Sequence, residues 1–83
     1  MSKHDKLLIR LLSKPKTFDW NDLRTVLQGL GYQELQGSGS RVKFYHSETK
    51  DVISLHQPHP GSEMKVGAIK DVANHLKEKG YER

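Results

Sequence analysis

The sequence contains no cysteine, and this absence excludes several classes of protein. Without thiols, the chain has neither a disulfide framework nor a thiolate zinc site. Its hydrophobic runs are also short, because Arg10 interrupts the stretch that begins at Leu7, whereas a membrane span needs about 20 apolar residues. The polar, charged start does not resemble a signal peptide. We therefore expect a cytoplasmic protein that does not associate with a membrane.

The chain is also short, and its length limits what it can build. With 83 residues it has room for one domain and a single small core, which excludes a large multi-domain enzyme and a transporter. Hydrophobic residues make up 34% and charged residues 29%. This balance is typical of a globular domain and not of a disordered tail.

The net charge of +4 originates in the first segment of the chain. Residues 1–16 hold five lysines and arginines and one aspartate, whereas basic and acidic side chains balance over residues 17–83. A basic excess favours a polyanionic partner such as nucleic acid. An ordinary solvated helix face has the same composition, so both interpretations stay open.

Leucines recur at helical spacing near the start of the chain, with basic residues on the other positions. The pattern predicts a short amphipathic helix over residues 2–14. Pro15 ends it, because proline disfavours helical geometry in the residue before it. We therefore divide the chain into a basic helix with its joint, residues 1–16, and a main domain, residues 17–83. Docking on that domain is the commonest outcome for such a stripe, and pairing with a second copy or a partner stays open.

The main domain is predicted to begin and end with a helix. An apolar stripe predicts the first of these helices, with Thr17 or Asp19 as its N-cap and Gly31 after its end. A second stripe within residues 66–76 predicts the last helix, with Ser62 as its N-cap. Alternating polarity between them predicts three antiparallel strands. The strands cover residues 32–36, 41–46 and 51–56.

The predicted order is helix, three strands and helix, an α+β class in two layers with an additional N-terminal helix. This order resembles the double-stranded-RNA-binding fold, and short motifs along it resemble the HicA family of bacterial toxin–antitoxin systems. The resemblance covers about residues 18–78. The motifs are Leu30-Gly31-Tyr32, Gly39-Ser40, Phe44, His59-Pro60, Glu63-Met64-Lys65, Gly67, Ile69-Lys70 and Val72.

The resemblance implies a small endoribonuclease, an mRNA interferase that needs no metal or other cofactor. It also implies a HicB-like antitoxin that covers the active surface. In this family a histidine just after the Gly-Ser turn is catalytic, since cleavage through the ribose 2′-OH needs a group that moves a proton near neutral pH. Here Arg41 holds that position, or Ser40 if Gly37-Ser38 is taken as the turn. Arginine stays protonated and suits phosphate binding, so enzymatic activity is an open question.

Alternation along the second strand places Arg41, Lys43 and Tyr45 on one exposed face. Two cations and an aromatic ring suit phosphate contact with base stacking, although a solvated sheet face has the same pattern. The fold resemblance adds Lys65 and Lys70, because lysines on that helix meet phosphates across the major groove. The expected RNA-binding residues are Ser38, Gly39, Ser40, Arg41, Lys43, Tyr45, Lys65 and Lys70.

Three histidines near the strand ends are candidates for the missing catalytic group. We expect His46 and His56 to lie close together across the hairpin, with His59 following in the His-Pro motif. Arg41 completes this candidate catalytic set as the residue that stabilises developing charge. We expect no metal site, because no cysteine or carboxylate accompanies these histidines at a familiar ligand spacing.

Three functions therefore remain open. The first is an RNA-binding protein in which cleavage is lost or altered. The second is an active, metal-independent endoribonuclease that uses a relocated histidine. The third is an interaction module that binds an antitoxin-like protein. The missing histidine favours the first and third, and the basic strand face favours the first over the third.

Overall fold

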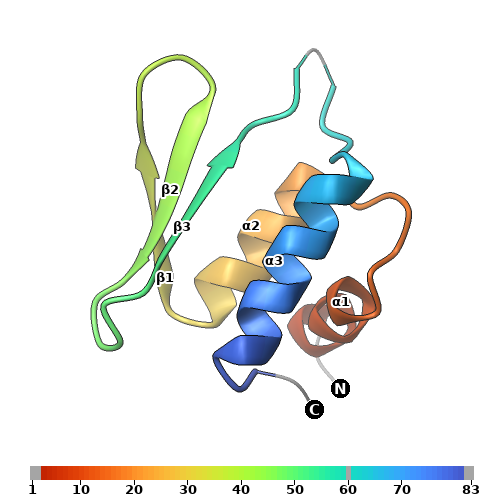
Figure 1. Ribbon diagram of the computed structural model, residues 1–83, viewed down its shortest axis with the longest axis horizontal. Coiled ribbons are helices and arrows are strands. Elements are labelled where there is room, and N and C mark those ends of the chain that lie inside the picture. The colour runs from red at the N-terminus through yellow and green to blue at the C-terminus, as the bar shows by residue number, and fades with distance from the viewer. Residues whose placement is uncertain (1–2, 60, 82–83) are drawn as a thin grey trace.

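Helices and strands follow the predicted order in the computed structural model, which describes residues 3–59 and 61–81 (Figure 1). Over these residues the class is α+β, as predicted. The elements are α1 (Lys3–Leu12), α2 (Trp20–Gly29), β1 (Tyr32–Gln36), β2 (Arg41–His46), β3 (Val52–His56) and α3 (Val66–Glu78).

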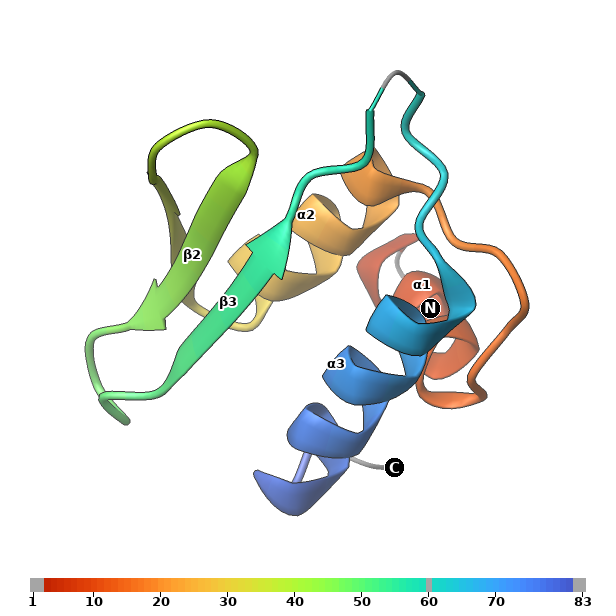
Figure 2. The same ribbon diagram turned by 45° about the horizontal axis from the view of Figure 1, so that its top comes forward.

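The strands form one antiparallel sheet in the order β1-β2-β3. Val42 and Phe44 of β2 are buried, whereas Arg41 and Lys43 are exposed, so the predicted alternation is confirmed. α2 and α3 lie on the same side of the sheet, and its other side faces away from every helix (Figures 1 and 2). One face therefore belongs to the core and the other is open to solvent.

α2 begins and ends at the residues that the sequence indicates. Asp19 is its N-cap, and the side-chain Oδ2 accepts a hydrogen bond from the backbone N–H of Asn21 at 2.9 Å. Of the two predicted caps, Asp19 is thus the one in use. Gly31 follows the helix with a φ of 104°, a left-handed conformation that favours glycine.

The predicted start of the last helix is wrong. α3 begins at Val66 and has no side-chain cap, and Ser62 lies in a bend before it. There the carbonyl of Ser62 accepts from the N–H of Trp20 at 2.7 Å, and its hydroxyl donates to Oδ1 of Asp19 at 2.5 Å. Pairing with the chain before α2, which includes an antiparallel bridge between Glu63 and Asp19, holds this segment outside the helix, so α3 starts only after it.

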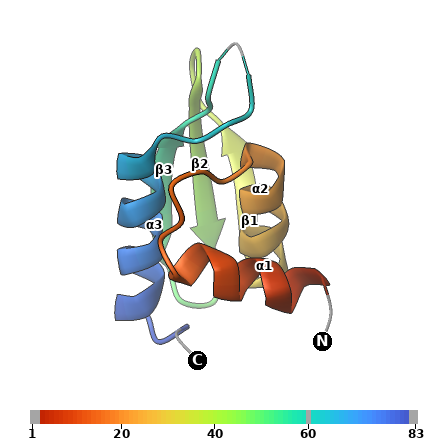
Figure 3. The ribbon, with the colours of Figure 1, turned by 90° about the vertical axis from the view of Figure 1, so that its right-hand side faces the viewer.

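α1 docks on the main domain, as the leucine stripe favours. It lies across α2 and α3 on the side away from the sheet and adds a third layer (Figure 3). Leu8, Leu11 and Leu12 are buried in the same core as the side chains of the other helices and the sheet. Nε2 of His4 also lies 3.0 Å from the carbonyl oxygen of Val26 on α2. A division of the chain at residue 16 stays a prediction, because one core spans it.

Within the part of the chain that the structure describes, every helix is too short or too polar to cross a bilayer.

Candidate nucleic-acid interface

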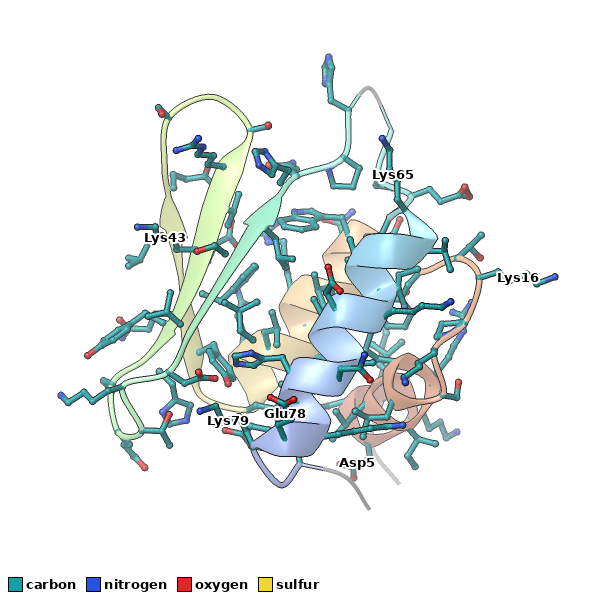
Figure 4. All side chains as sticks on the ribbon, in the orientation of Figure 1. Asp5, Lys16, Lys43, Lys65, Glu78 and Lys79 are labelled. Carbon is teal, nitrogen blue, oxygen red and sulfur yellow. The ribbon has the colours of Figure 1, made fainter. Side chains whose placement is uncertain are left out.

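The open side of the sheet carries cations and lacks acids. We define the outer sheet face by the outward-pointing side chains of the three strands. Arg41 and Lys43 are its cations, and Figure 4 shows Lys43 pointing away from the helices. None of its members is an aspartate or glutamate, so no carboxylate of this face opposes an approaching phosphate. The outer sheet face consists of Gln33, Leu35, Arg41, Lys43, Tyr45, Val52, Ser54 and His56.

The sheet register decides which of these side chains are neighbours. Arg41 pairs with His56 on β3, and Lys43 pairs with Leu35 on β1 and Ser54 on β3. Directly opposite residues on antiparallel strands have Cβ atoms about 4.5–5.5 Å apart. A permanent cation and an imidazole therefore lie side by side at one end of the sheet.

A groove of about 800 Å³ opens beside this end of the sheet, between β3 and the start of α3. We call it the β3–α3 groove. His56 at the end of β3 and His59 in the following loop line the groove. Lys65, the residue before α3, lines it as well. Ser40 reaches it from the β1–β2 turn, where its Oγ lies 3.4 Å from Nδ1 of His56. The groove thus joins residues that are distant in sequence.

Several predicted site residues therefore lie together. Ser40, His56, His59 and Lys65 share the β3–α3 groove, and Arg41 lies opposite His56 at its edge. Gly39 lines a smaller hollow beside it with Ser40 and His59. The sequence does not indicate this grouping, because it depends on strand register and on the path of the loop before α3.

His46 lies elsewhere, and the expectation that it approaches His56 is wrong. It pairs with Tyr32 at the opposite end of β2 and is only 7% exposed. Its Nδ1 accepts hydrogen bonds from the backbone N–H groups of Glu48 and Thr49, both at 3.3 Å. Its Nε2 therefore carries the proton and donates to the carbonyl of Leu30 at 3.0 Å. Both ring nitrogens are occupied in the fold, so this arrangement does not suit a catalytic base.

The remaining predicted residues lie around the site. Ser38 is exposed in the β1–β2 turn, and Tyr45 is half-buried two positions beyond Lys43 on the outer sheet face. Lys70 is exposed on α3 but does not line the groove.

Sequence reasoning assigned no role at the site to two carboxylates of the groove, Glu63 and Asp71. Asp71 lies three residues after Ala68 on α3, and both line the groove. Residues at this spacing share one face of a helix. The spacing thus indicates that Ala68 and Asp71 share a helix face. Nothing in the sequence indicates that this face lines a groove.

A polar cluster at the other end of β3 was also missed. Tyr32 donates a hydrogen bond to Oδ2 of Asp51, and Nε2 of His75 lies 2.7 Å from the same oxygen. Burial, together with the bond and the charge of Asp51, raises the pKa of the Tyr32 hydroxyl far above its usual value. The cluster ties α3 to the β2–β3 turn, away from the groove.

Metal coordination finds no support among the described residues. Within residues 3–59 and 61–81, no group of three histidine, aspartate or glutamate side chains comes together as a ligand set.

Comparison with known proteins gives one match. The model of a family described as the HicA toxin of bacterial toxin–antitoxin systems matches residues 20–81, which is most of the chain. The chain belongs to the HicA toxin family. The predicted resemblance is confirmed, and the α-β-β-β-α part is the double-stranded-RNA-binding-like fold of a HicA-type domain. No curated protein and no solved structure matches the chain.

The HicA match begins at the first residue of α2, so α1 lies before it. α1 nevertheless shares the core, which makes it an addition to the matched HicA region and not a detached arm. That Arg41 occupies the place of the family's catalytic histidine stays a prediction.

Proposed function

We propose that this HicA-family chain binds RNA along the outer sheet face and the rim of the β3–α3 groove. One observation carries the proposal: Arg41 and Lys43 are exposed on a sheet face that has no carboxylate. The two residues lie about 6.7 Å apart along the strand, so each can meet a separate phosphate. Arginine adds a planar fork of donors that suits a phosphate oxygen pair.

The start of α3 supports the same proposal. Lys65 is exposed at the groove, and the first turn of α3 has neither a side-chain cap nor an acidic residue. Its leading N–H groups therefore favour an anion, and the adjacent lysine adds a full charge. A strand of RNA that leaves Arg41 can continue along this rim.

The salt dependence of RNA binding tests the proposal. Arg41→Ala with Lys43→Ala should lower the slope of log affinity against log salt concentration by about one to two units. The matched control is Lys3→Ala with Lys6→Ala, which removes two exposed cations from α1. Its slope should change less. An equal or larger change in the control would place the RNA elsewhere.

The position of His56 favours a second function, cleavage of the bound RNA without a metal. His56 is exposed, contacts Ser40 and lies opposite Arg41. In the proposed step His56 takes the proton of the ribose 2′-OH, and the 2′-oxygen forms a bond to phosphorus. The bond from phosphorus to the 5′-oxygen breaks, and His59 or water gives that oxygen a proton. Arg41 stabilises the charge on the phosphate.

Cleavage of labelled RNA tests this second function. His56→Gln should abolish the formation of a 2′,3′-cyclic phosphate end, and a 2′-deoxy residue at the cleaved position should do the same. His59→Gln should slow the reaction less, because water can replace a proton donor. Cleavage that survives both the His56 change and the deoxy substitution would exclude this mechanism.

An antitoxin partner, of the HicB-like kind, is proposed to cover the same outer sheet face. Leu35, opposite Lys43, is 48% exposed there, and Val52, opposite Tyr45, is 45% exposed. Exposed apolar side chains on a polar face are typical of a protein interface. Leu35→Ser with Val52→Thr should weaken partner binding more than RNA binding in parallel titrations. A larger loss of RNA binding than of partner binding would contradict this location of the interface.

A further inference from the structure

The floor of the β3–α3 groove is apolar, although its rim is polar. Leu55 and Ala68 are half-buried and Met64 is buried, and all three line the groove. A phosphate needs hydrogen-bond donors and gains nothing from such a floor. A flat heteroaromatic ring gains from contact with apolar side chains and still offers a polar edge to the rim. The composition of the groove therefore fits a nucleobase better than a phosphate.

Two carboxylates make the groove selective. Asp71 and Glu63 line it, and within the described residues neither side chain has an ion pair or a hydrogen bond. They would repel a phosphate placed inside the groove. A carboxylate does accept hydrogen bonds from the amino group on the edge of a base, as it does from N4 of cytosine. Adenine, cytosine and guanine carry such an amino group, and uracil does not.

We infer that the β3–α3 groove is a pocket for one unpaired nucleobase that bears an amino group. The base lies on Leu55, Met64 and Ala68, and its amino edge faces Asp71. Its own phosphate lies at the rim, where Ser40 and His56 meet Arg41. This pocket deepens the proposed RNA binding and rests on it. A base within a duplex cannot enter, so the pocket selects single-stranded or bulged RNA.

A larger side chain in the groove tests the pocket separately from the phosphate contacts. Ala68→Leu adds three carbon atoms at a residue that lines the groove, and leucine keeps the helical propensity of the position high. The matched control is Gly67→Ala on the neighbouring residue of α3. A Cβ at Gly67 meets no atom within 4 Å, so this change leaves the groove open. Thermal unfolding of both variants checks that the fold is intact.

The experiment measures the affinity of short oligonucleotides of adenine, cytosine and uracil and of an abasic ribose-phosphate chain. The wild type should prefer adenine and cytosine to uracil and to the abasic chain. Ala68→Leu should weaken adenine and cytosine binding about tenfold, the value expected for loss of one stacked base, and leave the abasic chain unchanged. Gly67→Ala should bind all four like the wild type.

A polar change tests the edge contact. Asp71→Asn keeps the size of the side chain but adds an amide donor, which can serve the carbonyl of uracil. Binding of uracil should rise relative to adenine and cytosine, with affinity for the abasic chain unchanged. An unaltered base preference in Asp71→Asn would overturn the assignment of Asp71.

Different results would overturn the nucleobase pocket and the RNA binding on which it rests. Binding of the abasic chain and of all bases alike, with no effect of Ala68→Leu, would overturn the pocket and keep the phosphate contacts. Loss of antitoxin binding in Ala68→Leu with unchanged RNA binding would also overturn it, since a peptide would then fill the groove. Absence of binding to every oligonucleotide would refute the proposed function.

Discussion

Asp51 shows at the residue scale how a charge is held inside this small fold. Burial has the largest single effect on the pKa of the Asp51 carboxyl group and by itself would raise it. The hydrogen bonds from Tyr32 and His75, together with the charges of His75 and Lys79, outweigh burial and hold the pKa of this carboxyl group below its usual value. The ionised carboxylate therefore stabilises the contact between α3 and the β2–β3 turn.

The stability of the protein should consequently fall in acid. A carboxyl group with a lowered pKa in the folded state contributes its full stability above its unfolded pKa of about 3.9 and loses it as the pH falls through the folded pKa. Denaturant unfolding between pH 2.5 and 7 should show a steeper loss below pH 4 in the wild type than in Asp51→Asn. At pH 7 the substitution should cost about 1–3 kcal/mol. Parallel curves for the two proteins would contradict the assignment.

Gly31 should tolerate no side chain. Its φ is 104°, and a Cβ there would lie 2.6 Å from Nε2 of His46, the atom that donates to Leu30. Gly80 follows α3 as Gly31 follows α2, also at positive φ, but a Cβ at Gly80 meets nothing within 4 Å. Gly80→Ala should therefore cost only the backbone strain, about 1–2 kcal/mol.

Gly31→Ala adds the collision with His46 to the same strain, so its free energy of unfolding should be lower than that of Gly80→Ala. Chemical denaturation of the two variants measures the difference. Equal losses would show that the ring of His46 moves aside without cost.

At the scale of the element, α1 behaves as part of the core and not as an appendage. Leu11 is fully buried between helices, whereas Ile9 on the same helix is 50% exposed. Both are aliphatic residues of similar size, so truncating each to alanine separates packing from helix propensity. Lys3 and Lys6 of α1 stay exposed when the leucines dock, and the guanidinium of Arg10 lies over the ring of Phe18 at 5.4 Å.

Leu11→Ala should therefore cost about 2–5 kcal/mol, and Ile9→Ala should cost well under about 1 kcal/mol. Denaturant melts of the two variants give both values. If the two losses were the same and small, α1 would be a loosely attached arm.

At the scale of the whole molecule, the cations lie on separate sides. Figure 4 shows Lys43 on the side away from the helices, Lys65 at the start of α3 and Lys16 on the loop between α1 and α2, on the opposite side from Lys43. The proposed RNA path joins Lys43 to Lys65 and leaves Lys16 uncovered. We therefore expect RNA to cover the side of the protein that carries Lys43 and Lys65 and to leave the opposite side exposed.

RNA should accordingly protect Lys43 and Lys65 from chemical acetylation and leave Lys16 reactive. Mass spectrometry of the protein acetylated with and without a single-stranded oligonucleotide measures the three sites together. Lys16 serves as the internal control, because all three lysines are exposed in the free protein. Protection of Lys16 with reactivity kept at Lys43 would reverse the proposed binding side.

The sequence alone predicts the elements, because helical and strand periodicity are local properties. Three such patterns predicted elements that are present in the structure: the leucine stripe of α1, the apolar stripe of α2 and the alternation from Arg41 to His46. The family resemblance was readable too, since its motifs lie in order along the chain. Residue type and spacing are sufficient for such features.

The tertiary structure decided which residues meet. Register places His56 beside Arg41 and sends His46 to the opposite end of the sheet, because a shift along a strand relocates every side-chain pair. Pairing with the chain before α2 holds Ser62 in a bend outside the helix, so α3 begins only at Val66. The groove exists only where β3, its loop and α3 converge. These contacts join distant parts of the chain, and no local pattern encodes them.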